Sequence, residues 1–238
     1  MSDKIFFFVN PDNISNNKFF LDEHESHHLT KVLRKSVGTE IWLTDGIGHV
    51  YLGTYKKNQN DVVNGTILKV FPRYGENKIQ IDLGIGILKK DKMNLVVEKA
   101  TECGVSEIVP LVLEKCIKRN INIDRLIKIS KSAVKQCGRS VFPNITNPLI
   151  LEELISAYDN NSIIVYHESG SNGSDILPEI LRNQSNILLI IGPEGDFSKE
   201  EISFLKEKEV TFINLGNRRL RSETAVITAL AQINLYNN

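Results

Sequence analysis

From residue 78 onward, short apolar runs alternate with stretches that have helical spacing, and this alternation restricts the fold more than any other feature. The runs occupy residues 78–86, 106–113, 162–166, 187–192 and 211–216. Strands that alternate with helices usually form a parallel sheet whose two faces the helices cover. The sequence therefore predicts an α/β domain.

Two of the predicted helices have recognisable ends. A helix at 93–103 should end at Gly104, because glycine adopts the left-handed conformation that closes a helix. A helix at 124–137 should be capped by Asp124 and should end at Gly138.

Residues 38–71 have a β pattern instead. Apolar and aromatic runs lie on both sides of Asp45-Gly46, which is a hairpin signal. Residues 72–77 then supply Pro, Gly and polar side chains, as a linker does. We predict a small, mostly β domain at residues 1–73 and the α/β domain at residues 74–238.

One short helix is expected before the hairpin, at residues 26–37. Its apolar face would consist of Leu29, Val32 and Leu33. Gly38 follows and is expected to end it.

Composition restricts the partners and the compartment. The 238 residues include 29 basic and 29 acidic side chains, so a nucleic acid would have to bind a local basic patch. The three cysteines are scattered, which suits a reducing compartment better than a disulfide framework. No apolar run reaches membrane length. We expect a cytoplasmic protein with no membrane partner.

The loop after the run at 187–191 is a candidate ligand site. Gly192, Pro193 and Gly195 interrupt regular structure and let the backbone approach a ligand. Ser198 and Glu201 then have the spacing of a capping box, so a helix should follow. Loops of this kind bind ligands in α/β proteins, although an ordinary strand-to-helix turn would have the same pattern.

A second candidate loop follows the last predicted strand. Arg218, Arg219 and Arg221 crowd the start of a helix that Ser222 can cap. Three cations at the positive end of a helix repel one another, so a carboxylate, a phosphate or an RNA backbone nearby would stabilise them. The alternative is a solvated basic loop.

The helix at 124–137 carries a basic stripe. Lys128, Lys131 and Lys135 lie on one face, and Arg139 follows the helix. The stripe could follow a phosphate backbone, although most charged helix faces are simply solvated. Together with the arginine loop it forms a candidate nucleic-acid surface.

Two further motifs indicate no cofactor. His24, His27 and His28 lack the spacing of metal ligands, so we predict no metal and interpret them as structural or as partner contacts. The Gly-Ile-Gly at residues 84–86 lacks the rest of a dinucleotide fingerprint.

Several segments occur here in the order of a known family. They read HHLTKVLRKSVGTEIWLTDG, KATECGVSEIVPL, KQCGRS with a following proline, IIGPEGDFSKEEI and LGNRRLRSETAVITAL. Together they closely resemble the RsmE family of ribosomal RNA methyltransferases, within the SPOUT superfamily. The resemblance spans nearly the whole chain, and the pairing of the GPEG and LR.ETA segments is its most specific part.

The resemblance implies an S-adenosylmethionine-dependent enzyme that methylates N3 of a uridine in the 16S rRNA of the small ribosomal subunit. It implies a PUA-like β-barrel domain for RNA binding at 1–73 and a SPOUT α/β domain whose C-terminal part, about 160–238, is a trefoil knot. It also implies a homodimer.

Three segments match the cofactor loops of the family. The implied cofactor-binding residues are Tyr166, His167, Gly192, Pro193, Glu194, Gly195, Leu215, Gly216, Leu220, Arg221, Ser222, Thr224 and Ala225. For RNA, the expected contacts are His28, Arg34, Lys128, Lys131, Lys135, Arg139, Arg218 and Arg219.

Methyl transfer to a uracil N3 requires removal of the N3 proton. Arg221 is expected to stabilise the developing uracil anion, and Glu194 or Glu223 to help remove the proton. The structural alternatives are a loop-forming role for Arg221 and a helix-start charge for Glu223.

Three positions depart from the family pattern, namely Asp196, Arg219 and Cys103. Asp196 replaces a usual glycine and puts the loop conformation in question. Two rival functions stay open. One is ribose 2′-O methylation by another SPOUT enzyme, and the other is RNA binding without catalysis, which would not need S-adenosylmethionine.

Overall fold

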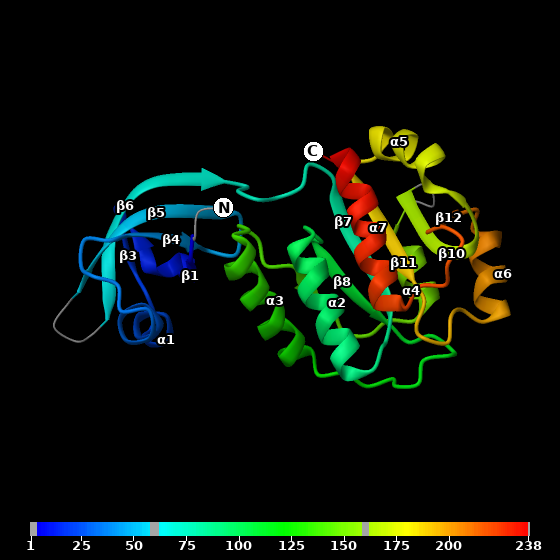
Figure 1. Cartoon of the computed structure of the whole chain (residues 1–238), viewed down its shortest axis with the longest axis horizontal. Helices are drawn as coiled ribbons and strands as arrows, with labels where there is room; N and C mark the ends of the chain where they lie inside the picture. The colour runs from blue at the N-terminus through cyan, green and yellow to red at the C-terminus, as the bar shows by residue number, and fades with distance from the viewer. Residues whose placement is uncertain (1–3, 58–61, 159–161, 238) are drawn as a thin grey trace. The chain divides into compact units, whose positions relative to one another are not determined.

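The computed structural model describes residues 4–57, 62–158 and 162–237. It divides into two compact units (Figure 1). The first unit comprises Met1–Glu76 and Lys131–Phe142, and the second comprises Asn77–Ser130 and Pro143–Asn238.

The first unit is built on a six-stranded sheet in the order β1-β4-β5-β6-β3-β2. Its elements are β1 (Phe6–Phe8), a 3-10 turn (Pro11–Asn13), β2 (Ile14–Ser15), β3 (Lys18–Phe20), α1 (Glu23–His27), a π-helical turn (His28–Val32), β4 (Glu40–Thr44), β5 (His49–Lys57) and β6 (Val63–Pro72). All pairs are antiparallel except β1 with β4. Phe7, Phe19 and Leu43 are fully buried in its core.

The hairpin predicted around Asp45-Gly46 joins β4 to β5 and is confirmed. The buried Asp45 carboxylate accepts hydrogen bonds from the backbone N–H groups of Ile47, Gly48 and His49. Gly46 has φ +72°, and a Cβ there would lie 2.3 Å from the Phe142 ring. Only glycine therefore suits this turn.

The helix before this hairpin differs from the prediction at both ends. It begins at Glu23, because the Asp22 carboxylate accepts a hydrogen bond from the Glu25 N–H at 2.7 Å. It ends at Val32, and Arg34 takes the left-handed conformation with φ +50°, so Gly38 does not end it. Val32 is exposed rather than part of the apolar face.

The second unit has the predicted parallel sheet, in the order β12-β10-β11-β7-β8-β9. Its elements are β7 (Gln80–Gly86), α2 (Lys90–Glu102), β8 (Glu107–Leu111), α3 (Ile123–Cys137), β9 (Asn144–Ile145), α4 (Leu151–Ser156), β10 (Ile163–Asn172), α5 (Gly173–Asn183), β11 (Asn186–Ile191), α6 (Lys199–Glu207), β12 (Thr211–Asn214) and α7 (Ser222–Asn237). The C-terminal residues of α3 belong to the first unit.

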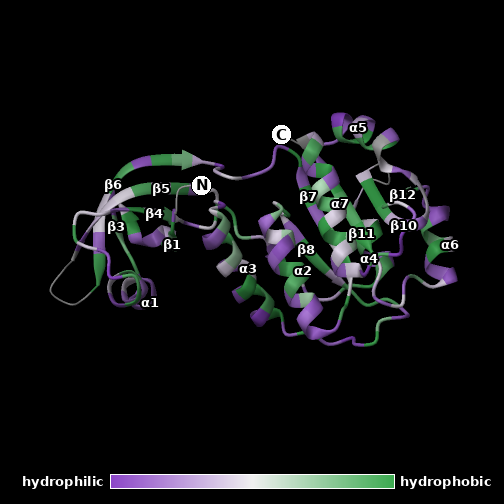
Figure 2. Ribbon diagram, viewed as in Figure 1, coloured by the Kyte–Doolittle hydropathy of each residue, from purple (hydrophilic) through white to green (hydrophobic). Residues whose placement is uncertain are grey.

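Helices cover both faces of this sheet, as alternation along β11 illustrates. Ile187, Leu189 and Ile191 pack with buried side chains of α2, α5 and α7. Leu188 and Ile190 pack with those of α4 and α6 on the other face. Figure 2 shows the resulting hydrophobic colour of the central strands β7 and β11. Burial on both faces explains why these strands are almost entirely apolar.

Three of the predicted helix ends are confirmed. Gly104 and Gly138 have φ +88° and +80° after α2 and α3. The Ser198–Glu201 capping box starts α6. The cap of α3 is different, because the side chain of Asn122, and not Asp124, accepts a hydrogen bond from the Arg125 N–H at 2.9 Å.

The start of α7 also differs by one residue. Ser222 is the first helical residue and not the cap. Arg221 precedes the helix, and its carbonyl accepts the first hydrogen bond, from the Ala225 N–H. Among the described helices, none is both long and apolar enough to cross a membrane.

Candidate active site

The three predicted cofactor loops begin at one edge of the parallel sheet. Tyr166, in the first half of β10, forms the last pair with β11, opposite Ile191, and pairs with Ile213 of β12 on its other side. Ligands bind at the carboxyl ends of strands in such sheets. The fold thus brings together three segments that are far apart in the sequence.

The Gly192–Gly195 loop is held by close backbone packing. A Cβ on Gly195 would lie 2.9 Å from the Lys115 Cβ. A Cβ on Gly86, at the end of β7, would lie 2.6 Å from the Pro193 ring. The Lys115 ammonium group donates a hydrogen bond to the Phe197 carbonyl at 2.6 Å. Gly86 therefore serves packing against this loop, whereas Gly84 lets the Leu154 and Leu111 side chains approach β7.

Asp196 completes the turn in the conformation that a glycine would take. Its φ is +63°, and its N–H donates to the Pro193 carbonyl at 2.9 Å. Its carboxylate accepts from the Phe197 N–H and lies 3.7 Å from Nε2 of His167. Aspartate tolerates the left-handed region better than most residues, because its short side chain bonds locally. The departure from the family glycine therefore keeps the turn.

Two candidate catalytic carboxylates face one lysine. The Lys92 ammonium group lies 3.3 Å from Oε1 of Glu194 and 3.9 Å from Oε2 of Glu223. The side chains of Glu194 and Glu223 are only 16% and 12% exposed. Sequence reasoning did not identify Lys92, although Lys89, Lys90 and Lys92 at the start of one helix were a signal. Cations are unfavourable there unless anions lie nearby.

Glu194 is held in its ionised form. Burial raises the pKa of Glu194, but hydrogen bonds from backbone N–H groups and from Lys92 outweigh this effect and keep the pKa below its usual range. One of those donors is the Lys89 N–H, 3.4 Å from Oε1. A carboxylate with a lowered pKa is a weak base.

Three buried polar atoms near these loops have no hydrogen-bond partner among the described residues. They are Oε2 of Glu194, Oε2 of Glu223 and the hydroxyl of Tyr166. Burial alone raises the pKa of the Tyr166 hydroxyl, so it stays protonated and can donate. Buried polar atoms without partners point to a polar ligand. The residues present therefore fit a cofactor with amino, carboxylate and hydroxyl groups.

The arginine loop, residues 215–221, is tied to the second half of β10, which continues through Tyr166 and His167 where a loop was expected. The Asn214 side chain donates to the Gly170 carbonyl at 2.6 Å and accepts from the Gly216 N–H at 3.1 Å. Gly216 has φ +97°. Arg218, Arg219 and Arg221 are all exposed, and none forms an ion pair with another described residue. They are available to an anion.

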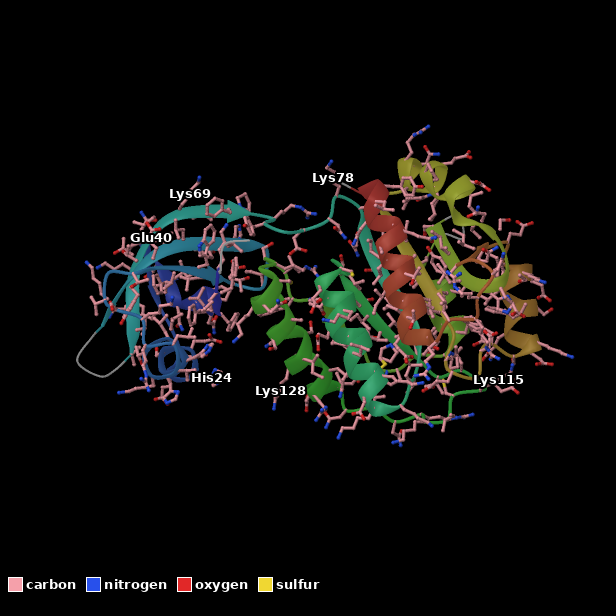
Figure 3. The ribbon with its side chains drawn as sticks, in the orientation of Figure 1. His24, Glu40, Lys69, Lys78, Lys115 and Lys128 are labelled. Atoms are coloured by element: carbon pink, nitrogen blue, oxygen red, sulfur yellow. The ribbon has the colours of Figure 1, made fainter. Side chains whose placement is uncertain are left out.

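The predicted lysine stripe is only partly free. Lys128 projects from α3 into solvent (Figure 3). Lys131 lies within 5.8 Å of the Phe8 and Phe142 rings, and Lys135 pairs with Glu25.

Arg139 does not fit its expected role in RNA binding. It is 3% exposed, and its guanidinium group lies 2.6 Å from the Glu76 carboxylate. A buried cation requires such a partner, so Arg139 stabilises the first unit instead.

The remaining RNA candidates lie in the first unit. Arg34 is exposed, whereas the His28 ring packs 5.7 Å from the Phe7 ring and is partly buried. Within the described parts of the chain, no group of His, Cys, Asp and Glu side chains is arranged to hold a metal ion.

Comparison with known proteins identifies the family. A model of an RNA methyltransferase domain matches residues 75–234, and a model of an RNA methyltransferase PUA domain matches residues 21–63. A curated relative from Rickettsia conorii, named ribosomal RNA small subunit methyltransferase E, is 32% identical over 96% of this chain and 94% of that protein. The chain belongs to the RsmE family of RNA methyltransferases. The sequence resemblance is thereby confirmed.

Solved structures agree with this assignment. A ribosomal RNA small subunit methyltransferase E from Neisseria gonorrhoeae, bound to S-adenosylmethionine, has a TM-score of 0.86 at 25% identity and covers 98% of this chain and 97% of that one. A Legionella pneumophila protein, solved with S-adenosylmethionine as its bound cofactor, has a TM-score of 0.84 at 27% identity and covers 98% of this chain and 97% of that one. The expected α/β methyltransferase fold with a PUA domain is confirmed.

Proposed function

We propose that this enzyme transfers the methyl group of S-adenosylmethionine to N3 of a uridine in 16S rRNA of the small ribosomal subunit. The observation that carries the proposal is the convergence, at one sheet edge, of Glu194, Glu223 and the arginine loop. Relatives named small subunit methyltransferase E, and their structures with S-adenosylmethionine, support the substrate and the cofactor.

The cofactor is assigned to the three strand-end loops. Its contacts would come from Tyr166, His167, Gly192, Pro193, Glu194, Gly195, Leu215, Gly216, Leu220, Arg221, Ser222, Thr224 and Ala225. When bound, S-adenosylmethionine supplies an electrophilic methyl group. The loops orient it and exclude water.

Three side chains have different roles in the reaction at the uracil. Glu223 accepts the N3 proton, because its buried Oε2 lies 3.9 Å from Lys92 and has no hydrogen-bond partner among the described residues, whereas Lys92 and the Lys89 N–H bind Glu194 more closely. Glu194 stays ionised, and its negative charge holds the Lys92 ammonium group beside Glu223. Arg221, exposed directly before α7, stabilises the negative charge that develops on the uracil oxygens.

RNA binding is assigned to two surfaces. Residues 1–73 form the PUA-like RNA-binding domain, with Arg34 and His28 as contacts, and the match of the PUA model supports this role. In the methyltransferase domain, 74–238, Arg218, Arg219 and Lys128 are exposed cations that could bind phosphate.

We further propose a homodimer and a trefoil knot at about 160–238. Exposed Leu95 on α2 and Ile227, Leu235 and Tyr236 on α7 support an apolar dimer surface. The chain passes from β10 to β11 and then returns to the other side of β10 as β12. This strand order is compatible with a knot, in which the C-terminal segment passes through an earlier loop. A cytoplasmic location fits an rRNA substrate.

Labelled S-adenosylmethionine and small subunits that lack the modification provide the test. The wild-type protein should transfer label to the RNA of these subunits and should not label fully modified ones. Binding of the cofactor without any transfer would overturn the proposed substrate. Absence of cofactor binding would favour the non-catalytic RNA-binding alternative.

A further inference from the structure

A pocket of about 160 Å³ lies in the second unit, between the start of α2, the segment before α3 and the first turns of α3. Its floor is apolar, and Met93 and Leu126 in it are 1% and 3% exposed. None of the residues assigned to the cofactor lines it. The proposed reaction therefore leaves this pocket without a role.

The polar lining of the pocket is cationic and amide-rich. It consists of Lys90, Lys118, Arg125, Asn94, Asn120 and Asn122. No acidic residue is among the lining side chains. Basic side chains that line a pocket without carboxylates create a positive electrostatic potential there, and this potential attracts anions.

Part of this lining is held in place. Nε of Arg125 donates a hydrogen bond to the Asn94 side chain at 3.4 Å. The Asn122 side chain is fixed as the cap of α3 by the Arg125 N–H. The pocket thus joins an oriented guanidinium group and amides to an apolar floor.

The pocket adjoins the carboxylate cluster through α2. Lys90, Met93 and Asn94 have the i, i+3, i+4 spacing of one helix face and line the pocket. Leu88 and Lys90 also line the pocket, and the N–H of Lys89 between them lies 3.4 Å from Oε1 of Glu194. A strand whose target base lies at the carboxylates would therefore bring a neighbouring nucleotide to the pocket.

We propose that this pocket binds one nucleotide of the rRNA strand next to the target uridine. Lys90 and Lys118 hold its phosphate, the Asn94 amide bonds the base edge, and the Arg125 guanidinium plane stacks on the base. The pocket is smaller than the roughly 300–1,000 Å³ of sites for drug-sized ligands, so it would enclose the base and leave the sugar and phosphate at its rim. This inference rests on the proposed function, because it assumes an RNA substrate.

The test measures the affinity for small subunits that lack the modification, over a range of salt concentrations. Lys118→Gln should bind about tenfold more weakly and should reduce the slope of log affinity against log salt by about 0.7, as the loss of one phosphate contact to a single strand does. Asn94→Ala should weaken binding without changing this slope. Arg182→Gln, an exposed arginine in the last turn of α5, removes the same charge elsewhere and should bind like the wild type.

Two results would overturn the inference. One is subunit affinity of both pocket variants equal to that of Arg182→Gln. The other is weaker binding of S-adenosylmethionine by the pocket variants, which would assign the pocket to the cofactor. Melting temperatures close to that of the wild type would show that the variants are folded. Failure of the wild type to transfer methyl groups would reject the proposed function, whereas subunit affinity would still decide the role of the pocket.

Discussion

The Lys92 ammonium group lies 3.3 Å from Oε1 of Glu194, and this contact joins the first turn of α2 to the Gly192–Gly195 loop. Glu223, in the first turn of α7, approaches the same lysine from another element. One lysine therefore contacts two glutamates that both lie more than 100 residues after it in the sequence. This arrangement predicts a distinctive pH response.

Lys92→Met should lower kcat about tenfold, since a charge-assisted hydrogen bond is lost. Lys92 is one cause of the lowered pKa of Glu194, so without it the carboxylate binds a proton at higher pH. Because the ionised Glu194 holds Lys92 beside the reacting groups, its protonation should lower the rate, and the acidic limb of the pH–rate profile should move to higher pH in the variant. Lys92→Arg keeps the charge and should restore most of the activity. An acidic limb that stays in place in Lys92→Met would contradict this role.

Arg221→Ala should lower kcat about 10²- to 10³-fold, as removal of a group that stabilises a developing anion does. The fold should persist, because Arg221 is exposed. Arg219→Ala is the matched control, with the same change two residues away. It should raise KM for the subunit and leave kcat unchanged. A kcat of Arg221→Ala equal to that of the wild type would contradict the proposed role of Arg221 in stabilising the uracil anion.

Glu223→Gln should slow methyl transfer at neutral pH by about 10²-fold, the usual contribution of a positioned base. Its activity should rise as the pH increases, because the uracil N3 then loses its proton without help. Wild type and variant should therefore converge at alkaline pH. A variant with a constant deficit at every pH would assign Glu223 a structural role.

Glu76→Ala should lower the free energy of unfolding by about 3–5 kcal/mol, because it leaves the Arg139 guanidinium buried without a counter-charge. Glu76 also accepts hydrogen bonds from the N–H groups of Ser140 and Val141. Urea unfolding measures the effect, and Glu102→Ala, at the more exposed Lys99 pair, is the control and should cause no measurable change. Equal free energies of unfolding for the two variants would show that the Glu76–Arg139 ion pair does not stabilise the first unit.

Local signals in the sequence predicted much of the fold. Apolar runs identified the parallel strands, and Gly104, Gly138 and the Ser198–Glu201 pair identified helix ends, because each depends on residues within one turn. The helix start at Asp22 was also readable. Asp22 and Glu25 have the capping-box spacing, but the apolar pattern alone placed the helix too late.

Contacts between distant segments could not be predicted in this way. Arg139 had the sequence context of a surface cation, and its burial depends on Glu76, 63 residues earlier. Lys92 similarly acquires its role from Glu194, which only the tertiary fold brings near. The motif resemblance located the loops, yet the distances between their side chains came from packing.

The identity of the modified nucleoside tests the central claim most directly. Small subunits that lack the modification should be incubated with the wild-type protein and S-adenosylmethionine, and their RNA digested and analysed by mass spectrometry. The account predicts uridine methylated at N3, strongly reduced with Arg221→Ala. A nucleoside methylated at the ribose 2′-oxygen would contradict the roles of Glu223 and Arg221 in uracil chemistry.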